Sequence, residues 1–488
     1  MNLRSTIVAK RQQRIRSEGN EFGHSVPVER RVPIVPFPAP PGIICEVKRR
    51  SPSRGDIDEE VDVAKHIGRY VEGGAGSVSV LTEEDYFHGE LPDLIAAKEA
   101  NPGVSFLRKD FLLSRADVDV SYRAGADAIL LIASILDPDE LADLEAYASS
   151  LGMTAMVEIH DTDDLQKARR FTPRCVGCNA RNLATFAVDL LEPLVLRRAI
   201  DWQCTTVFES GIWNREDAAV AASSGFDAIL VGESVVRDPG IVPDLIDGFS
   251  SKASRFWGEV ANRRSSDEKG RNPLIKICGL TRLEDVRLAV SLGADLLGFI
   301  FADESPRLTT AAFVSSIGAA EALKVAVVVS DGGVIPGEVS RLLESGAVDA
   351  VQLHGDEEPD ECFDLAFPYY KACRVSAPGD LELVRRYRSP RVLLDAYSKR
   401  ARGGTGQRIG DEIVAAAAES GPLWLAGGIT EKNVSEIVRR FAPELIDAAT
   451  GVEKAPGIKD HKKLEALFNN SRNLSGDNST VFSRHTVE

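Results

Sequence analysis

A glutamate and a lysine two residues apart, Glu46 and Lys48, stand within an otherwise apolar and β-branched run at residues 43–48. Side chains at this spacing point to the same face of a strand, so the pattern places a carboxylate beside an ammonium group. Such charges are costly in a buried strand unless they are paired, solvated or used in chemistry. The segment SPSRG at 51–55 follows, and its hydroxyls, base and glycine suit an anion. From this stretch alone, a structural ion pair followed by an ordinary turn is an equal alternative.

Other apolar runs in the first half also end in polar or charged residues. These residues are Lys109, Glu158, Asn179, Arg181, Glu209 and Ser210. Together with Glu46 and Lys48 they supply side chains that donate and accept protons in general acid–base catalysis. One such residue could be a side chain whose charged end reaches solvent. Packing explains the whole set poorly, so we interpret it as a candidate catalytic site.

Glycine and hydroxyl segments indicate phosphate binding in both halves. Glycine allows backbone N–H groups to approach an anion closely. The candidates are Ser51, Gly211, Gly232 and Ser234 in the first half, and Gly427, Gly428, Thr450 and Gly451 in the second. We therefore predict that each half binds a phosphorylated substrate.

In the second half, Lys276 and Cys278 share one face of a predicted strand. A neighbouring cation can lower the pKa of a cysteine, which is ordinarily about 8.5, so we predict that Cys278 accepts a proton as a thiolate. Asp395 ends a later apolar run and is the candidate acid for proton transfer at a sugar carbon. Arg307 could bind a substrate carboxylate through its guanidinium fork. The alternative for Cys278 is a small buried hydrophobe.

These residues need elements to position them, and the chain supplies a repeating pattern. Apolar, β-rich runs alternate with amphipathic segments at helical spacing, which predicts parallel strands joined by helices. The strands predicted in the first half are 43–48, 77–82, 104–109, 128–133, 154–160, 175–181, 206–211 and 228–234. Those predicted in the second half are 274–280, 296–301, 324–329, 350–354, 369–375, 391–396, 422–427 and 445–451. We therefore predict an α/β fold of two consecutive (β/α)8 TIM barrels, with active sites at the carboxyl ends of the strands.

The composition is that of a globular protein with more than one domain. The chain has 488 residues, of which 43% are hydrophobic and 27% charged, values typical of soluble proteins. We place the first barrel at 1–249, a linker at 250–272, the second barrel at 273–468 and a disordered tail at 469–488. The basic N-terminal segment is predicted to be a helix.

Charge and cysteine usage exclude several functions. The net charge of −16 argues against a nucleic-acid or anionic-membrane binder, and no apolar run reaches the length of a membrane span. Without a signal-peptide core, a cytoplasmic location is expected. Cys175 and Cys178 have CxxC spacing, but the predicted strand points them to opposite faces. Only His160 and His354 stand at strand ends, so we expect no metal and no cofactor.

Motifs in order along the chain resemble two enzyme families. The first half resembles indole-3-glycerol-phosphate synthase through CEVKRRSPSRG, SVLTEEDYFHG, FLRKDF, VEIH, CNARNL, FESGI and ILVGES. The second half resembles phosphoribosylanthranilate isomerase through KICGLT, GFIFADESPR, VQLHG, LLDAYSKRARGGTGQ, LAGGIT and GVEKAPGIKD. The resemblance covers residues 42–470 and implies a bifunctional enzyme of tryptophan biosynthesis.

The resemblance also implies roles for the candidate residues. In the isomerase half, Cys278 would be the base and Asp395 the acid of an Amadori rearrangement, with Arg307 holding the anthranilate carboxylate. In the synthase half, Lys48 would be the general acid and Glu158 the base. In the same half, Lys109 would be a second candidate acid, and Glu46 would orient Lys48. The substrate would be bound by Asn179, Arg181, Glu209 and Ser210. The partners implied are small phosphorylated anthranilate sugars, and a monomer is the working expectation.

Two departures and three alternatives stand beside this interpretation. The segment before the first strand is shorter than is usual for the family, and Ala448-Ala449 replace common hydroxyl residues. One alternative is that only one barrel is active and the other is a structural or phosphate-binding scaffold. The others are a different pair of phosphosugar isomerases and a non-catalytic phosphate-binding protein.

Overall fold

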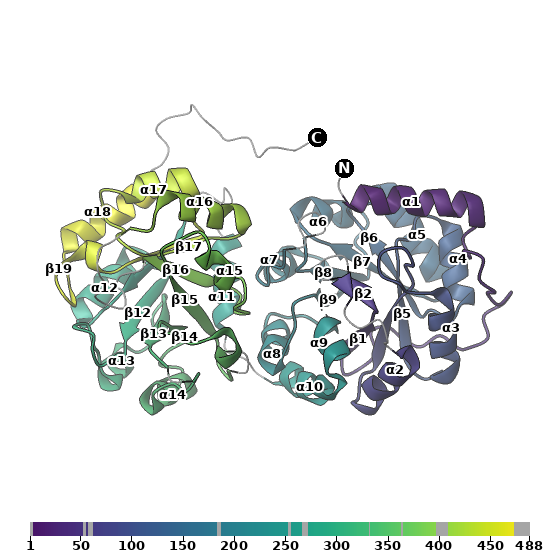
Figure 1. Ribbon diagram of the computed structural model, residues 1–488, viewed down its shortest axis with the longest axis horizontal. Coiled ribbons are helices and arrows are strands. Elements are labelled where there is room, and N and C mark those ends of the chain that lie inside the picture. The colour runs from purple at the N-terminus through teal and green to yellow at the C-terminus, as the bar shows by residue number, and fades with distance from the viewer. Residues whose placement is uncertain are drawn as a thin grey trace. The chain divides into compact units, whose positions relative to one another are not determined.

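The computed structural model describes residues 3–51, 55–56, 62–182, 187–251, 255–265, 272–330, 332–362, 365–396 and 408–472. The chain divides into two compact units, Met1–Ala253 and Ser254–Glu488. Each unit contains one closed barrel of parallel strands surrounded by helices (Figure 1). The predicted fold class of two consecutive (β/α)8 barrels is therefore confirmed.

The first barrel has the strand order β1-β10-β9-β8-β7-β6-β5-β4, and β1 closes it by pairing with both β4 and β10. Its strands are β1 (Ile43–Val47), β4 (Ser77–Leu81), β5 (Ser105–Lys109), β6 (Ala128–Ile132), β7 (Thr154–Ile159), β8 (Cys175–Asn179), β9 (Thr205–Glu209) and β10 (Ala228–Val231). Its helices are α1 (Leu3–Glu18), α2 (Val63–Glu72), α3 (Leu91–Ala100), α4 (Arg115–Arg123), α5 (Pro138–Ser150), α6 (Thr162–Arg169), α7 (Glu192–Ala199), α8 (Arg215–Ser223), α9 (Glu233–Arg237) and α10 (Val242–Ser250). A short hairpin, β2 (Arg50–Ser51) and β3 (Gly55–Asp56), follows β1.

The second barrel has its strands in sequence order, with β11 pairing β18 to close it. The strands are β11 (Leu274–Cys278), β12 (Leu296–Ile300), β13 (Leu323–Val328), β14 (Ala350–Leu353), β15 (Tyr369–Val375), β16 (Val392–Ala396), β17 (Trp424–Leu425) and β18 (Leu445–Ala448). The helices are α11 (Phe256–Ser265), α12 (Leu283–Ser291), α13 (Ala311–Ile317), α14 (Gly337–Glu344), α15 (Asp380–Val384), α16 (Asp411–Ser420), α17 (Val434–Phe441) and α18 (His461–Arg472). A hairpin of β19 (Glu453–Ala455) and β20 (Ile458–Lys459) precedes α18.

Local sequence signals explain where several helices begin and end. The side chains of Ser114 and Asn214 accept hydrogen bonds from backbone N–H groups in the first turns of α4 and α8, as N-cap residues do. Gly125 and Gly225 follow these helices with φ of 95° and 84°, a conformation that glycine adopts without strain. Each glycine therefore ends a helix and lets the chain enter the next strand.

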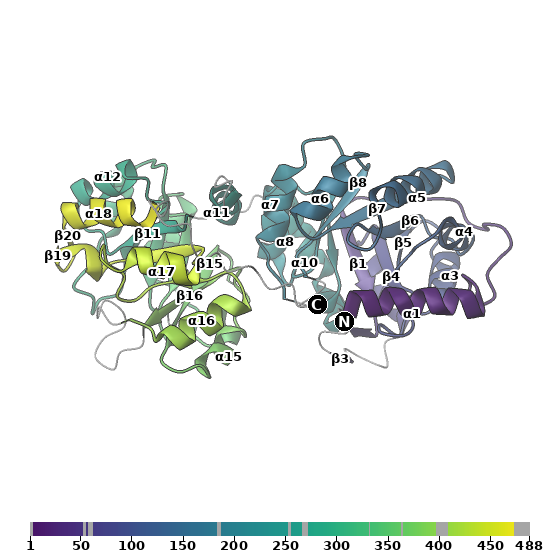
Figure 2. The same cartoon turned by 90° about the horizontal axis from the view of Figure 1, so that it is seen from above.

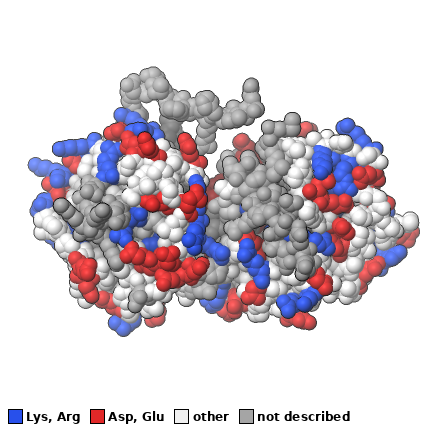
Figure 3. Space-filling view, viewed as in Figure 1, with Lys and Arg blue, Asp and Glu red and all other residues white. Residues whose placement is uncertain are grey.

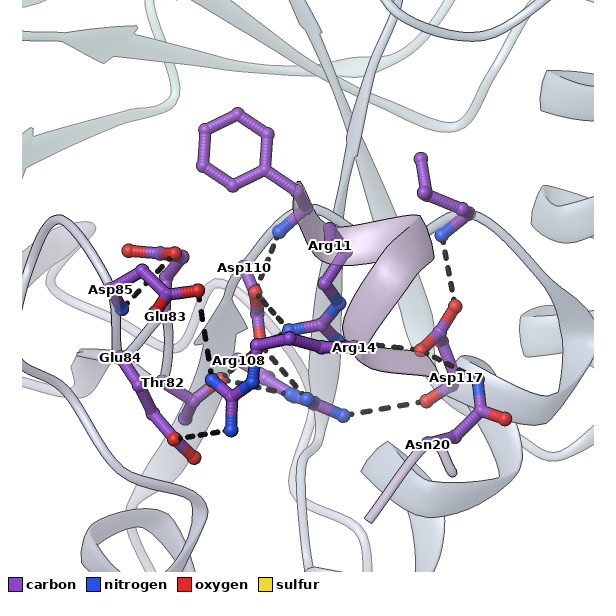
Figure 4. A network of polar contacts seen from close by, with 12 residues as sticks. Arg11, Arg14, Asn20, Thr82, Glu83, Glu84, Asp85, Arg108, Asp110 and Asp117 are labelled. Carbon is purple, nitrogen blue, oxygen red and sulfur yellow. Dashed lines mark hydrogen bonds and ion pairs between the residues drawn. The ribbon is translucent and has the colours of Figure 1, made fainter. Parts of the chain in front are cut away.

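The N-terminal helix α1, expected from the sequence, is attached to the first barrel by buried ion pairs (Figure 4). Arg11 donates to both carboxylate oxygens of Asp110 at 2.9 and 3.1 Å and to Asp117 at 3.3 Å. Asp110 also accepts from Arg108 at 2.8 Å and from Thr82 at 2.7 Å. Because Arg108 and Asp110 flank Lys109 at the end of β5, this network ties α1 to a strand end of the predicted site.

Two features differ from the expected linker and tail. α11 lies within residues 250–272, and its Phe256 and Trp257 rings lie 6.4 and 6.0 Å from the rings of Tyr370 and Trp424, measured between centroids. Since Tyr370 is the second residue of β15 and Trp424 the first of β17, α11 packs against the amino-terminal end of the second barrel. α18 continues to Arg472, and residues 473–488 lie outside the described part of the chain.

Two observations concern the prediction that the chain binds neither nucleic acid nor a membrane: the distribution of surface charge and the character of the helices. Acidic and basic side chains are both spread over the face shown in Figure 3. None of the helices among the described residues combines the length and the apolar character that crossing a membrane requires.

Candidate active sites

The first barrel places its polar candidates one inward position beyond an apolar layer. The apolar layer includes Ile44, Leu107, Met156, Cys175 and Val207. Two residues further along the same strands are Glu46, Lys109, Glu158, Gly177 and Glu209. Because inward positions recur every second residue, these side chains face the barrel axis at the carboxyl end. The structure therefore brings together residues that the sequence placed at separate strand ends.

Two lysines bind the carboxylates at this carboxyl end of the first barrel, which we call its mouth. Lys48 Nζ lies 2.8 Å from Glu46 Oε1. Lys109 Nζ lies 2.8 Å from Glu209 Oε2, 3.5 Å from Glu46 Oε2 and 3.8 Å from Glu158 Oε2. Glu46 thus contacts both lysines, so the ion pair expected as the structural alternative exists and is part of the larger cluster.

Glu158 is held from two further directions. Asn179 Nδ2 donates to Glu158 Oε2 at 3.1 Å, and His160 Nε2 lies 3.2 Å from Glu158 Oε1. Gly177, opposite Glu158 on β8, makes room for Glu209, because a Cβ atom there would lie 2.0 Å from Glu209 Oε1. A side chain at position 177 would therefore displace the carboxylate that binds Lys109.

The charges in this cluster shift one another's pKa values. Burial alone would lower the pKa of Lys109, but three carboxylates, first of all Glu209, outweigh it and raise the pKa. Burial raises the pKa of Glu209 against the effect of Lys109, and Glu158 adds to the rise. For Glu158, burial is outweighed by His160 and Lys109, and its pKa is lowered. At neutral pH Lys109 is thus protonated and Glu158 ionised, as an acid and a base require.

The remaining candidates of the first barrel lie around this cluster. The backbone N–H of Arg181 donates to Asn179 Oδ1 at 2.9 Å. Ser210 and Gly211 have φ of 71° and 83°, so the chain turns sharply after β9. Ser234 Oγ donates to the carbonyl of Ile212 at 2.9 Å, which joins the segments after β9 and β10.

Gly232 has a role that the sequence did not indicate. A Cβ atom there would lie 2.7 Å from both Glu46 Oε1 and Lys48 Nζ, so the glycine leaves space for this ion pair as well as exposing backbone. Ser51 lies in β2, where only its backbone is described, and Ser53 lies outside the described residues.

In the second barrel, every predicted site residue lines one cavity of about 750 Å³. These residues are Cys278, Arg307, Asp395, Gly427, Gly428, Thr450 and Gly451. The cavity lies at the carboxyl ends of the strands, as predicted for this fold. Its lining also includes Gln352, His354 and Asp447, which the sequence reasoning did not assign to the site.

Lys276 lowers the pKa of Cys278 as predicted, but the net shift of that pKa is upward. Lys276 Nζ is fully buried and lies 2.5 Å from both Asp447 Oδ2 and Gln352 Oε1. Burial raises the pKa of the Cys278 thiol, and the lowering by Lys276 does not overcome it because Asp447 acts against the lysine. Gly298 leaves room for the thiol, since a Cβ atom there would lie 2.6 Å from Cys278 Sγ. Cys278 is therefore mainly a thiol at neutral pH, and not the thiolate that we expected.

Arg307 already binds a carboxylate within the protein. Its Nε and Nη2 donate to Glu453 at 2.9 and 2.8 Å, and Nη2 also donates to Thr450 Oγ1 at 3.2 Å. Lys459 joins the same carboxylate at 3.0 Å and donates to the Cys278 carbonyl at 2.6 Å. The hairpin β19–β20 thereby links the arginine to the end of β11.

Asp395 is oriented by two contacts. Its Oδ1 accepts the backbone N–H of Ala396 at 2.8 Å, and its Oδ2 lies 3.2 Å from His354 Nε2. His354 Nδ1 lies 3.3 Å from the Gln352 side-chain amide. The carboxyl group consequently lies at the cavity wall beside an imidazole.

The phosphate-binding candidates of the second barrel lie on two adjacent segments, one after β17 and one after β18. Gly427 and Gly428 have φ of 87° and 62°. Asn433 Nδ2 donates to the Gly428 carbonyl, and Asn433 Oδ1 accepts the Thr430 N–H, both at 2.8 Å. Gly451 allows close packing, because a Cβ atom there would lie 1.9 Å from the Ile429 carbonyl oxygen.

Each half of the chain matches a known protein family. The family model of indole-3-glycerol phosphate synthase matches residues 10–242, and that of N-(5'phosphoribosyl)anthranilate (PRA) isomerase matches residues 275–470. A multifunctional tryptophan biosynthesis protein of Schizosaccharomyces pombe is 30% identical over 471 residues, which are 89% of this chain and 60% of that protein. The chain thus spans about three fifths of the length of this relative.

Single-activity relatives match each half separately. An indole-3-glycerol phosphate synthase of Bacillus cereus is 41% identical over 200 residues, which are 41% of this chain and 79% of the bacterial protein. A crystal structure of phosphoribosyl anthranilate isomerase from Thermus thermophilus is 33% identical, covering 40% of this chain and 96% of that one, with a TM-score of 0.35. The chain therefore belongs to the indole-3-glycerol phosphate synthase family through its first half and to the phosphoribosylanthranilate isomerase family through its second half.

Proposed function

We propose that this chain is a bifunctional enzyme, a lyase and an isomerase, of tryptophan biosynthesis. The second barrel converts N-(5-phosphoribosyl)anthranilate to 1-(2-carboxyphenylamino)-1-deoxyribulose 5-phosphate. The first barrel converts this product to indole-3-glycerol phosphate, with loss of CO2 and water. The observation that carries the proposal is that each barrel gathers its own acid and base candidates at the carboxyl ends of its strands.

The isomerase reaction needs one acid and one base on either side of a sugar. Asp395 donates a proton to the ring oxygen of the phosphoribosyl group, the C1–O bond breaks, and the nitrogen lone pair forms an iminium. Cys278, as a thiolate, takes the proton from C2 to give an enolamine. Protonation at C1 and loss of the enol proton then yield the ketone. Both residues line the same cavity, which this division of roles requires.

The synthase reaction needs two proton donations and one proton removal. The ring carbon that bears the carboxylate attacks the ribulose carbonyl carbon, and Lys48 donates a proton to the carbonyl oxygen. The bond to the carboxylate breaks, and its electron pair restores the aromatic ring as CO2 leaves. The hydroxyl group leaves as water with a proton from Lys109, while Glu158 takes the proton from the carbon next to nitrogen.

Substrate binding follows from the groups around these centres. Arg307 meets the anthranilate carboxylate, which has to share the guanidinium with Glu453. The phosphate lies against backbone N–H groups near Gly427, Gly428, Thr450 and Gly451 in the second barrel. In the first barrel it lies near Ser51, Gly211, Gly232 and Ser234.

Separate assays on the purified chain test the proposal. One assay follows loss of phosphoribosylanthranilate, and the other supplies the carboxyphenylamino-deoxyribulose phosphate and follows the indole product, both without added metal. We expect both reactions. If only one proceeded, the silent barrel would be a scaffold, and if neither did, the proposal would be wrong.

A further inference from the structure

A histidine outside the predicted set contacts the proposed base of the synthase reaction. His160 follows β7, and its side chain is only 8% exposed. Its Nε2 lies 3.2 Å from Glu158 Oε1, and its Nδ1 lies 3.3 Å from Asp164 Oδ2. The imidazole is therefore enclosed between two buried carboxylates.

Each oxygen of Glu158 has a separate environment. Oε2 accepts from Asn179 at 3.1 Å and lies 3.8 Å from Lys109 Nζ, on the side of the candidate cluster. Oε1 has His160 as its charged neighbour. One oxygen thus belongs to the mouth where substrate binds, whereas the other is directed at the imidazole.

Asp164 is fixed in place by the start of α6. Its backbone N–H donates to the N-cap residue Asp161 at 2.9 Å. Its Oδ2 accepts the backbone N–H of His160 at 3.1 Å as well as contacting the imidazole. The same carboxylate therefore fixes both the main chain and the ring of His160.

The surrounding charges favour an imidazolium. Burial alone would lower the pKa of His160, but Asp164 and Glu158 outweigh it and raise the pKa to about 10. The other charged groups near Glu158 are Lys109 from β5 and Glu209 from β9. Burial would raise the pKa of Glu158, and the cation at His160 is the largest of the effects that oppose it, ahead of Lys109 and a hydrogen bond with Glu209.

We propose that His160 is a positioning residue for the synthase reaction, in which its imidazolium, held by Asp164, orients Glu158 and keeps that carboxylate ionised until it takes the substrate proton. The inference rests on the proposed function of the first barrel. It assigns His160 no contact with substrate, since it acts through Glu158 alone.

The variant His160→Gln removes the charge and keeps a hydrogen-bonding side chain. With the carboxyphenylamino-deoxyribulose phosphate as substrate, we expect kcat to fall about 10- to 100-fold, part of the usual contribution of a general base, and KM to change less than about threefold. Since Glu158 loses a cation, its pKa rises, and the acid limb of the kcat profile moves to higher pH. Isomerase activity of the same chain should stay at the wild-type level.

A matched control is available elsewhere in the first unit. His24 Nε2 lies 2.8 Å from Glu84 Oε1, and both side chains are about a quarter exposed, at 25% and 24%. His24→Gln removes a histidine–carboxylate pair that includes none of the proposed proton-transfer groups, and it should leave kcat and the pH profile unchanged.

A double-variant cycle decides whether His160 acts through Glu158. Adding His160→Gln to Glu158→Gln should cost less than about twofold beyond Glu158→Gln alone, because the group acted upon is already lost. Independent, multiplying losses, or an unshifted acid limb, would overturn the proposal. If His160→Gln failed to fold, as shown by circular dichroism and by denaturant unfolding of the first unit, Asp164→Asn should produce the same shift in smaller size, and its absence would overturn the proposal. A wild-type chain that formed no indole product would refute the proposed function itself, whereas an active wild type with unaffected variants would refute only the role of His160.

Discussion

Two buried proton acceptors in this chain have opposite pKa shifts for the same electrostatic reason. Burial would raise the pKa of the Glu158 carboxyl group, but its charged neighbours His160 and Lys109 outweigh burial and lower the pKa. Cys278 also has a lysine neighbour, but Asp447 opposes that lysine, so burial dominates and the thiol pKa is raised. The balance between burial and the nearby cations therefore decides the direction of each pKa shift.

We predict that isomerase activity rises with pH because of this shift at Cys278. Below its pKa, the thiolate fraction increases tenfold per pH unit, so kcat/KM should increase by about tenfold per unit between pH 6 and 8. Asp447→Asn removes a charge that adds to the rise of the thiol pKa caused by burial, and it should move this limb to lower pH. Rates of thiol alkylation by iodoacetamide at Cys278 should follow the same two curves. A profile that is flat from pH 6 to 8 would contradict Cys278 as the base.

The sequence predicted those features of the sites that depend on local strand alternation. It missed the contacts between residues that lie far apart along the chain. Glu46 and Lys48, or Lys276 and Cys278, could be placed on one face because strand alternation is a local rule. The partner that neutralises Lys276 stands 171 residues away, and no pattern in KICGLT indicates it. Arg307 was expected to be available to substrate for the same reason, since Glu453 lies 146 residues further on.

At the scale of elements, the ordering of strands and helices was predictable, and the attachments between them were not. Sixteen barrel strands follow from runs of apolar residues alternating with helical periodicity. α1 was also expected as a helix, but its contact with the end of β5 depends on two buried aspartates, Asp110 and Asp117. The packing of α11 on the second barrel depends likewise on the rings of Tyr370 and Trp424.

We predict that Arg11→Met destabilises the first unit strongly. The change leaves Asp110 and Asp117 buried with fewer partners, and removing one partner of a buried ion pair costs about 3–5 kcal/mol. Denaturant unfolding should show this loss in the first unit only. Arg14→Met is the matched control, because Arg14 is 20% exposed in its pairs with Glu18 and Glu84, against 7% for Arg11, and ion pairs nearer to solvent contribute less, about 1 kcal/mol at the surface.

The pH dependence of this loss gives a second check. Burial would raise the pKa of Asp110, but Arg11 and Arg108 outweigh it, and the pKa is lowered to about 2. A depressed carboxyl pKa stabilises the fold above the unfolded value of about 3.9 and ceases to do so as pH falls toward 2. The stability difference between wild type and Arg11→Met should therefore be smaller at pH 3 than at pH 7. A difference that grew on acidification would contradict the role of this pair.

At the scale of the whole molecule, each candidate site is complete within one unit. The proposed proton-transfer groups of the synthase, Lys48, Lys109 and Glu158, all belong to Met1–Ala253, and those of the isomerase, Cys278 and Asp395, to Ser254–Glu488. The two proposed reactions share only a diffusible molecule, the product of one and the substrate of the other. Two chains, each with one working barrel, should therefore complete the conversion together.

Complementation between two single variants tests this independence. Lys48→Ala should reduce synthase activity by at least about 100-fold, as loss of a general acid does, and leave isomerase activity within about twofold of wild type. Cys278→Ala should do the reverse. Neither variant alone should turn phosphoribosylanthranilate into indole-3-glycerol phosphate, but an equimolar mixture should, because the carboxyphenylamino-deoxyribulose phosphate released by the Lys48→Ala chain can enter the intact synthase barrel of the Cys278→Ala chain. If either variant lost both activities while remaining folded, the two sites would not be independent. If both retained their single activities but the mixture made no indole product, the intermediate would have to pass between barrels of one chain without release.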